Sequence, residues 1–90
     1  MLREIQKDLL SDPERGRLVP GLGGIRKART ANPGRGKGKR GGYRYFYLFL
    51  EDLGHFHLLL LLDKNEQDDL SAPERAVLRD LVQSIKESAR

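Results

Sequence analysis

The chain opens with apolar residues at helical spacing. Four of them predict an amphipathic helix over residues 2–11, namely Leu2, Ile5, Leu9 and Leu10. The helix should end before Pro13, since a proline disfavours the α conformation of the residue that precedes it. Residues 12–24 then contain two turn signals, Pro-Gly and Gly-Gly. We expect this segment to be irregular.

Three segments in the middle of the chain have the pattern of β-strands. Residues 25–30 form a short basic strand. Residues 43–50 are rich in aromatic side chains and apolar on both faces, as a central strand requires. The turn residues 51–54 then lead into a returning strand over residues 56–62.

A second apolar stripe predicts a helix at the end of the chain. Ser71 and Glu74 form an S-x-x-E capping box, and Pro73 is tolerated in the first turn. The stripe consists of Val77, Leu78, Leu81, Val82 and Ile85. The order of elements predicts a single α+β domain over residues 1–90, with a small antiparallel sheet and helices packed on it.

Composition narrows the class of protein. Ninety residues fit one domain with a small core. The sequence holds no cysteine, which excludes disulfides, thiolate nucleophiles and cysteine-ligated metals and fits a reducing compartment. The N-terminus lacks the pattern of a signal peptide, and the longest apolar runs, residues 45–50 and 58–62, are too short to cross a bilayer. We expect a cytoplasmic protein with no membrane partner.

Positive charge is concentrated in the first half of the chain. Residues 1–45 carry 12 Lys and Arg against 4 Asp and Glu, a net +8, whereas residues 46–90 carry 5 against 9, a net −4. The segment 26–44 holds eight basic residues and no acidic one. Such a field favours a polyanion or a protein with an acidic surface. A solvated basic loop is the alternative, but the position of the charge between two strands favours phosphate binding.

Two local patterns are incomplete as a nucleotide-binding site and a metal-binding site. Residues 34–39, Gly-Arg-Gly-Lys-Gly-Lys, look like a phosphate-binding P-loop but lack a Ser or Thr after the lysine and a helix behind it. His55 and His57 are two residues apart on a predicted strand, and no carboxylate or cysteine pattern completes a metal site around them. We expect neither nucleotide hydrolysis nor a bound metal.

Three blocks of the sequence carry a family resemblance. They are VPGLGGIRKAR at residues 19–29, PGRGK at 33–37 followed by GGYR at 41–44, and DKNEQDDLS at 63–71. In this order and spacing they resemble the HigB-like members of the RelE/ParE superfamily, the toxins of type II toxin–antitoxin systems. The resemblance spans residues 2–88.

The resemblance implies a RelE-like sheet with a concave basic face that receives RNA. It implies a toxin that inhibits translation by endonucleolytic cleavage of mRNA on the ribosome, held inactive by a cognate antitoxin of the HigA-like helix-turn-helix type. Attack of a ribose 2′-hydroxyl on the adjacent phosphorus requires no metal and no cofactor. Two alternatives stay open: a ParE-like inhibitor of DNA gyrase that is not a nuclease, and an inactive remnant that binds nucleic acid or antitoxin.

The same resemblance assigns roles to individual cations. Arg44 matches the arginine of the GYR motif, and its planar guanidinium suits two oxygens of the scissile phosphate. Lys27 and Arg29 match a pair of basic residues that supply acid–base or charge-stabilising groups, and Lys64 would bring a fourth cation to this catalytic set. The residues expected to bind flanking RNA are Arg26, Arg35, Lys37, Lys39, Arg40 and Tyr43.

The sequence departs from the family pattern in two places. Family members open with a strand and a helix that precede the first helix predicted here, so the resemblance implies an N-terminally shortened domain or a start that lies upstream. A missing strand would leave a sheet edge open to pairing with another chain, which makes a homodimer one expectation. Asn65 and Ser71 stand where the RelE pattern carries an arginine and a tyrosine, as in the HigB-like branch.

Overall fold

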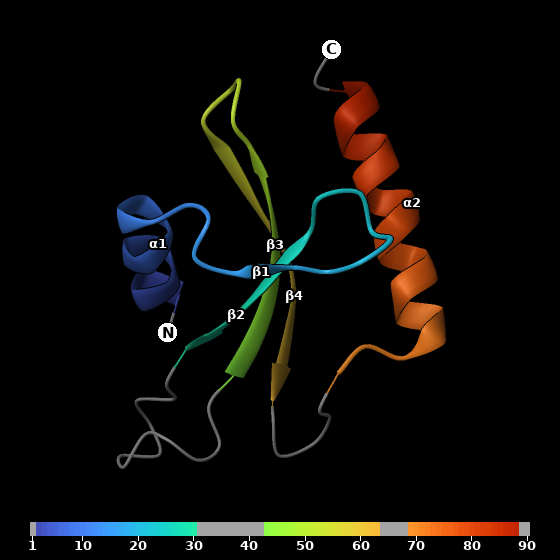
Figure 1. Cartoon of the computed structure of the whole chain (residues 1–90), viewed down its shortest axis with the longest axis horizontal. Coiled ribbons are helices and arrows are strands. Elements are labelled where there is room, and N and C mark those ends of the chain that lie inside the picture. Colours follow the sequence, from blue (N-terminus) through green and yellow to red (C-terminus); the bar gives the residue numbers. More distant parts are fainter. Residues whose placement is uncertain (1, 31–42, 64–68, 89–90) are drawn as a thin grey trace.

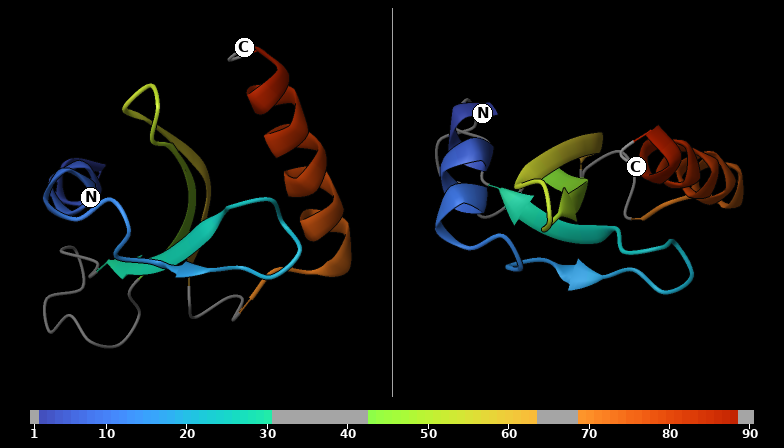
Figure 2. Two further views of the ribbon diagram at one scale, coloured as in Figure 1. Left: turned by 45° about the horizontal axis from the view of Figure 1, so that its top comes forward. Right: turned by 90° about the horizontal axis from the view of Figure 1, so that it is seen from above.

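Two helices enclose a four-stranded antiparallel sheet in the computed structural model, which describes residues 2–30, 43–63 and 69–88. The elements are α1 (Leu2–Ser11), β1 (Arg17–Leu18), β2 (Arg26–Thr30), β3 (Tyr43–Leu50), β4 (His55–Asp63) and α2 (Ala72–Ser88). The strands lie in the order β1-β2-β3-β4. Figures 1 and 2 show α1 and α2 on opposite sides of the sheet. The predicted α+β class and antiparallel sheet are confirmed.

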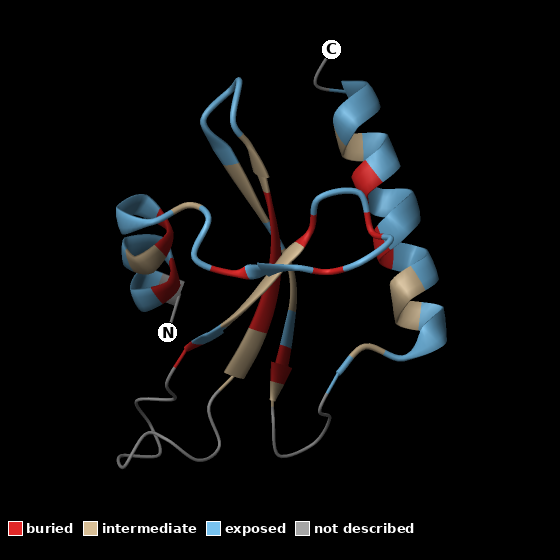
Figure 3. Ribbon diagram, viewed as in Figure 1, coloured by how far each residue is buried: buried red, intermediate tan, exposed pale blue. Residues whose placement is uncertain are grey.

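The central strand β3 divides the core into two parts. Because side chains alternate along a strand, Phe46 and Leu48 face α2 whereas Tyr45 and Tyr47 face α1. All four side chains are buried, which confirms the prediction of a strand covered on both faces. Figure 3 shows this burial along β3.

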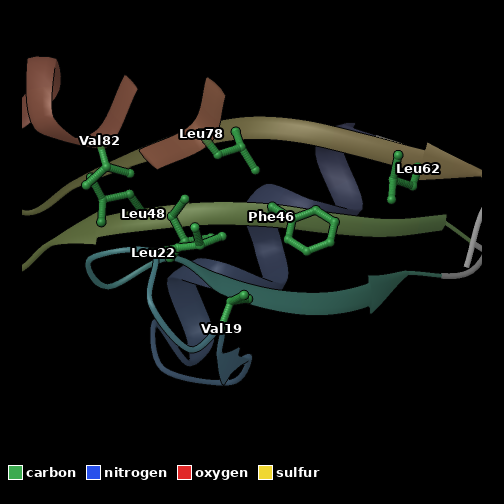
Figure 4. Close-up of a cluster of buried hydrophobic side chains, with 8 residues drawn as sticks. Val19, Leu22, Phe46, Leu48, Leu62, Leu78 and Val82 are labelled. Carbon is green, nitrogen blue, oxygen red and sulfur yellow. The ribbon is translucent and has the colours of Figure 1, made fainter. Parts of the chain in front are cut away.

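The larger part of the core lies between the sheet and α2. The buried side chains there are Val19, Leu22, Ile25, Phe46, Leu48, Leu62, Leu78 and Val82 (Figure 4). Three of them come from residues 19–25, the segment that turns from β1 into β2. Residues 12–24 were predicted to be irregular, and Ile25 was predicted to begin the basic strand, which starts at Arg26. The apolar side chains of the segment fill the space between strand and helix.

The smaller part of the core lies between the sheet and α1. Ile5 and Leu9 of the helix pack against the rings of Tyr45 and Tyr47. Their spacing confirms the predicted helix, but the exposed side chain of Leu10 does not belong to the buried face. A narrow contact of this kind makes α1 depend on the two tyrosines for its position.

The pairing of β3 with β4 contains a β-bulge. Phe46 lies opposite Leu60 and Tyr47 lies opposite Leu58, so that Leu59 is an extra residue on β4. An extra residue reverses which side chains face which layer on either side of it. Before the bulge Phe56 faces α1, where its ring stacks on Phe49 with centroids 4.7 Å apart.

The predicted capping box begins α2. The backbone N–H of Glu74 donates to Ser71 Oγ at 3.2 Å, and the N–H of Ser71 donates to Glu74 Oε1 at 2.8 Å. Both bonds satisfy donors that a helix leaves unpaired at its start. Neither α1 nor α2, the helices of the described ranges, is long and apolar enough to cross a membrane.

The predicted apolar stripe of α2 is wider than the buried face. Leu78 is 3% exposed, whereas its neighbour Val77 is 65% exposed. We therefore expect Leu78→Ala to lower the free energy of unfolding by about 2–5 kcal/mol, because it leaves a cavity against the sheet. Val77→Ala should change it by less than about 0.5 kcal/mol. Urea unfolding of both variants tests the assignment, and equal losses would contradict it.

Candidate nucleic-acid interface

Five cationic side chains line one pocket at the edge of the sheet. The pocket has a volume of about 400 Å³ and is lined by Arg15, Arg17, Lys27, Ala28, Arg29 and Arg44. Lys27, Arg29 and Arg44 are three of the four residues predicted to be catalytic. The fourth, Lys64, lies outside the described residues, as do the predicted RNA-binding residues Arg35, Lys37, Lys39 and Arg40.

Strand register brings the three predicted cations together. Arg29 of β2 lies directly opposite Arg44 of β3, and Lys27 lies on the same face of β2 as Arg29. Like charges directly opposite each other repel across a sheet. An anion bound between the two side chains would remove that repulsion. The arrangement is therefore suited to a phosphate.

Arg15 and Arg17 were not predicted as site residues. They lie in the segment judged irregular, and Arg17 belongs to β1, a strand of two residues in which Arg17 pairs with Lys27. The sequence shows an arginine on each side of Gly16, but a two-residue strand has no periodicity to detect. Only the antiparallel pairing places Arg17 beside the other cations.

The shortness of β1 leaves room for the pocket. β1 pairs with Arg26 and Lys27 only, so the last three residues of β2 have β3 on one side and no described strand on the other. The side chains of Arg15 and Arg29 flank this open stretch of the edge. A ligand can reach the cations there without displacing a strand.

Carboxylates partly balance the pocket's charge. Lys27 Nζ lies 3.6 Å from Asp69 Oδ2, and Arg15 Nη1 lies 3.1 Å from Asp8 Oδ2. A hydrogen bond from the backbone N–H of Leu70 holds the pKa of Asp69 below its ordinary value of 3.8, and the nearby cations lower it further. Asp69 is therefore an ionised, weakly basic carboxylate at neutral pH. It serves as a counter-ion for Lys27.

The remaining predicted residues have other surroundings. Arg26 does not line the pocket; its guanidinium donates to the backbone oxygens of Glu14 and Gly16 at 3.3 and 2.7 Å. Tyr43 is half-buried at the start of β3. The proposed contacts of Arg26 and Tyr43 with RNA stay predictions.

A second pocket, of about 470 Å³, lies between the β3–β4 hairpin and α2. His55 and His57 line it together with apolar side chains, and their ring centroids are 6.5 Å apart. No group of three His, Cys, Asp or Glu side chains that could hold a metal occurs within residues 2–30, 43–63 and 69–88. The pocket offers apolar surface rather than a set of charged ligands.

The cationic pocket can bind and polarise an oxyanion. Its guanidinium groups present paired N–H donors that match phosphate oxygens, and they keep their charge at any pH compatible with folding. No known protein-family model matches the sequence. The function must therefore be argued from the chemistry of this pocket together with the resemblance of the sequence blocks.

The counter-ion role of Asp69 leads to a prediction about its pKa. In Lys27→Gln the pKa of Asp69 should rise but stay below 3.8, because the bond from Leu70 N–H persists. The depressed pKa means that Asp69 contributes stability above pH 3.8, and this contribution is lost as the pH falls through the pKa of the folded state. A carboxyl-detected NMR titration measures the shift, with Lys86→Gln as a distant control. An unchanged pKa in Lys27→Gln would argue against the contact.

Proposed function

We propose that the chain is a RelE/HigB-like toxin that inhibits translation by cleaving mRNA on the ribosome. The cationic pocket is the site at which it binds the scissile phosphate. The observation that carries the proposal is the convergence of Arg15, Arg17, Lys27, Arg29 and Arg44 on one pocket. Three of these five residues were selected from the sequence before their positions were known.

Electrostatics favours a polyanion over a single small anion. Two unit charges 4 Å apart interact by about 4 kcal/mol at an effective dielectric constant of 20, so a cluster of five cations is costly without counter-charge. Asp8 and Asp69 supply two carboxylates at its margin. Consecutive phosphates of a nucleic acid would add counter-charge along the pocket and release bound counterions from the strand.

RNA differs from DNA in carrying its own nucleophile. The 2′-oxygen forms a bond to phosphorus as the bond to the 5′-oxygen breaks, which gives a 2′,3′-cyclic phosphate and a 5′-hydroxyl. The 2′-hydroxyl proton passes to solvent, and the leaving oxygen takes up a proton. Arg29 and Arg44, side by side across two strands, would stabilise the extra negative charge on phosphorus-bound oxygens. Lys27 would hydrogen-bond the leaving oxygen.

The ribosome and an antitoxin enter this proposal through the sequence resemblance. Asp69, the carboxylate beside Lys27, is a weak base because its pKa is lowered. A ribosome can compensate by orienting the ribose and excluding competing conformations. An antitoxin would inhibit by covering the cationic pocket with acidic side chains. Both partners are testable by adding them to the purified chain.

Arg44→Ala should reduce mRNA cleavage in a reconstituted translation reaction by about 10²–10³-fold, because one charged donor is removed from the phosphorane. Cleavage sites are mapped by primer extension on a defined message. Arg79→Ala is the matched control, since it removes the same charge from an exposed position on α2 that does not line the pocket. Its cleavage pattern should equal that of the wild type.

The same reaction separates the alternatives. Wild-type protein that binds RNA but leaves messages intact would identify a remnant without nuclease activity. Intact messages combined with blocked supercoiling by DNA gyrase would favour the ParE-like inhibitor. Equal cleavage by wild type and Arg44→Ala would show that the cationic pocket is not the active site.

A further inference from the structure

The segment between α1 and β1 is held by one buried hydroxyl group. Tyr47 Oη accepts a hydrogen bond from the backbone N–H of Gly16 at 3.1 Å and donates one to the carbonyl oxygen of Pro13 at 2.8 Å. Tyr47 is fully buried in the centre of β3, 31 residues away from Gly16 in the sequence. The hydroxyl therefore ties residues 13–16 to the most rigid strand of the sheet.

Arg26 holds the same segment from the neighbouring strand. Its Nη1 donates to the carbonyl oxygens of Glu14 and Gly16, and Arg26 lies opposite Tyr47 in the β2–β3 register. Together the two side chains bind the backbone of Pro13, Glu14 and Gly16 through four hydrogen bonds. Arg26 Nη1 is used in these bonds and Arg26 does not line the pocket, which separates its observed contacts from those of the pocket cations.

Gly16 brings the segment into direct contact with β2. A Cβ atom at this position would lie 2.7 Å from the carbonyl oxygen of Lys27, closer than side-chain atoms approach backbone. The residue is buried, and any larger side chain would push the segment away from the strand. The flanking residues Arg15 and Arg17 are both exposed and both line the cationic pocket.

We propose that Arg15 and Arg17 form a second phosphate-binding arm, which the Tyr47 hydroxyl and the Arg26 guanidinium position beside the cations of β2 and β3. The proposal rests on the proposed function, because it assumes that the pocket binds single-stranded RNA. It adds that the pocket holds two phosphates of one strand. One phosphate lies at Arg29 and Arg44, and the neighbouring one lies at the arm.

Two features of the arm support a separate subsite. Arg15 and Arg17 come from the segment that precedes β2 in the chain, and they line the same pocket as Arg29 and Arg44, which face each other in the β2–β3 ladder. The ion pair of Arg15 with Asp8 of α1 keeps its guanidinium oriented when no RNA is bound. The Tyr47 hydroxyl and Arg26 Nη1 bond to backbone atoms of the segment and do not line the pocket, so both side chains act as positioning residues.

The first test counts the phosphate contacts of the arm. Binding of a 2′-O-methylated RNA oligonucleotide, which offers phosphates but no nucleophile, is measured at several salt concentrations. Arg15→Gln combined with Arg17→Gln should lower the slope of log K against log salt by about 1.4, at about 0.7 per phosphate contact on a single strand. Arg79→Gln combined with Lys86→Gln removes the same charge from α2 and should leave the slope unchanged.

The second test isolates positioning with two chemically identical changes. Tyr47→Phe removes the hydroxyl that holds the segment, whereas Tyr45→Phe removes a buried hydroxyl for which the described residues offer no hydrogen-bond partner. We expect Tyr47→Phe to bind the RNA about tenfold more weakly, equivalent to about 1.4 kcal/mol, and Tyr45→Phe to bind as wild type. Hydrogen exchange at the Gly16 amide should accelerate in Tyr47→Phe alone.

A double-mutant cycle distinguishes positioning from general destabilisation. If Tyr47 acts through the arm, Tyr47→Phe should have no further effect on RNA affinity once Arg15 and Arg17 are glutamine. Additive losses would overturn the positioning role, and an unchanged salt slope in the double arginine variant would overturn the arm while the proposed function stands. Absence of salt-dependent RNA binding by the wild type would overturn both. Circular dichroism confirms that each variant is folded.

Discussion

The alternation of side chains along β3 is the constraint on which the rest of the structure depends. One set of residues, Phe46 and Leu48, is covered by α2, and the other set, Tyr45 and Tyr47, is covered by α1. By the same alternation, Arg44 lies on the same face of β3 as Phe46, and it is not among the side chains that pack against α2. A slip by one residue would exchange the two sets between the faces and carry Arg44 to the face of α1. The register that builds the core therefore also fixes the cation that lies at its end.

The two tyrosines of β3 show how a core can serve a site. Both rings pack against α1, and their centroids are 5.8 Å apart. Desolvation raises the pKa of both hydroxyls, so each is a neutral donor and acceptor at physiological pH. Only the Tyr47 hydroxyl has backbone partners among the described residues. Tyr45 contributes apolar area to the core. Tyr47 does the same, and its hydroxyl also fixes residues 13–16 relative to β3.

Much of the fold could be predicted from the sequence, because its signals are local. The helix over residues 2–11, the strand over 43–50 and the capping box at Ser71 each follow from spacing within a few residues, and the structure confirms all three. β1 was missed because two residues carry no period, and its pairing depends on partners eight and ten residues away. Val77 was assigned to the buried face because spacing alone does not give the width of that face.

The candidate site, like the fold, could be predicted only in part from the sequence. The resemblance assigned Lys27, Arg29 and Arg44 to one catalytic set, and the β2–β3 register brings the three side chains to one pocket. Arg15 and Arg17 could not be found because their approach depends on a tertiary contact at Gly16. Arg26 was grouped with the cations by charge alone. Its hydrogen bonds to carbonyl oxygens depend on the path of a segment that sequence periodicity does not define.

The extra residue at Leu59 has a consequence for how this domain can change during evolution. On the C-terminal side of the bulge, Leu60 and Leu62 face α2, and on the N-terminal side Phe56 faces α1. Deleting one residue there would restore a regular ladder and turn the two histidines of β4 towards α1, taking Phe56 away from Phe49. The alternation of side chains along β4 is therefore shifted by one residue between the hairpin end and the end near Arg44. A change of length inside β4 would alter which face each side chain occupies, whereas a change at the hairpin tip, residues 51–54, would leave the pairing of Arg44 with Arg29 as it is.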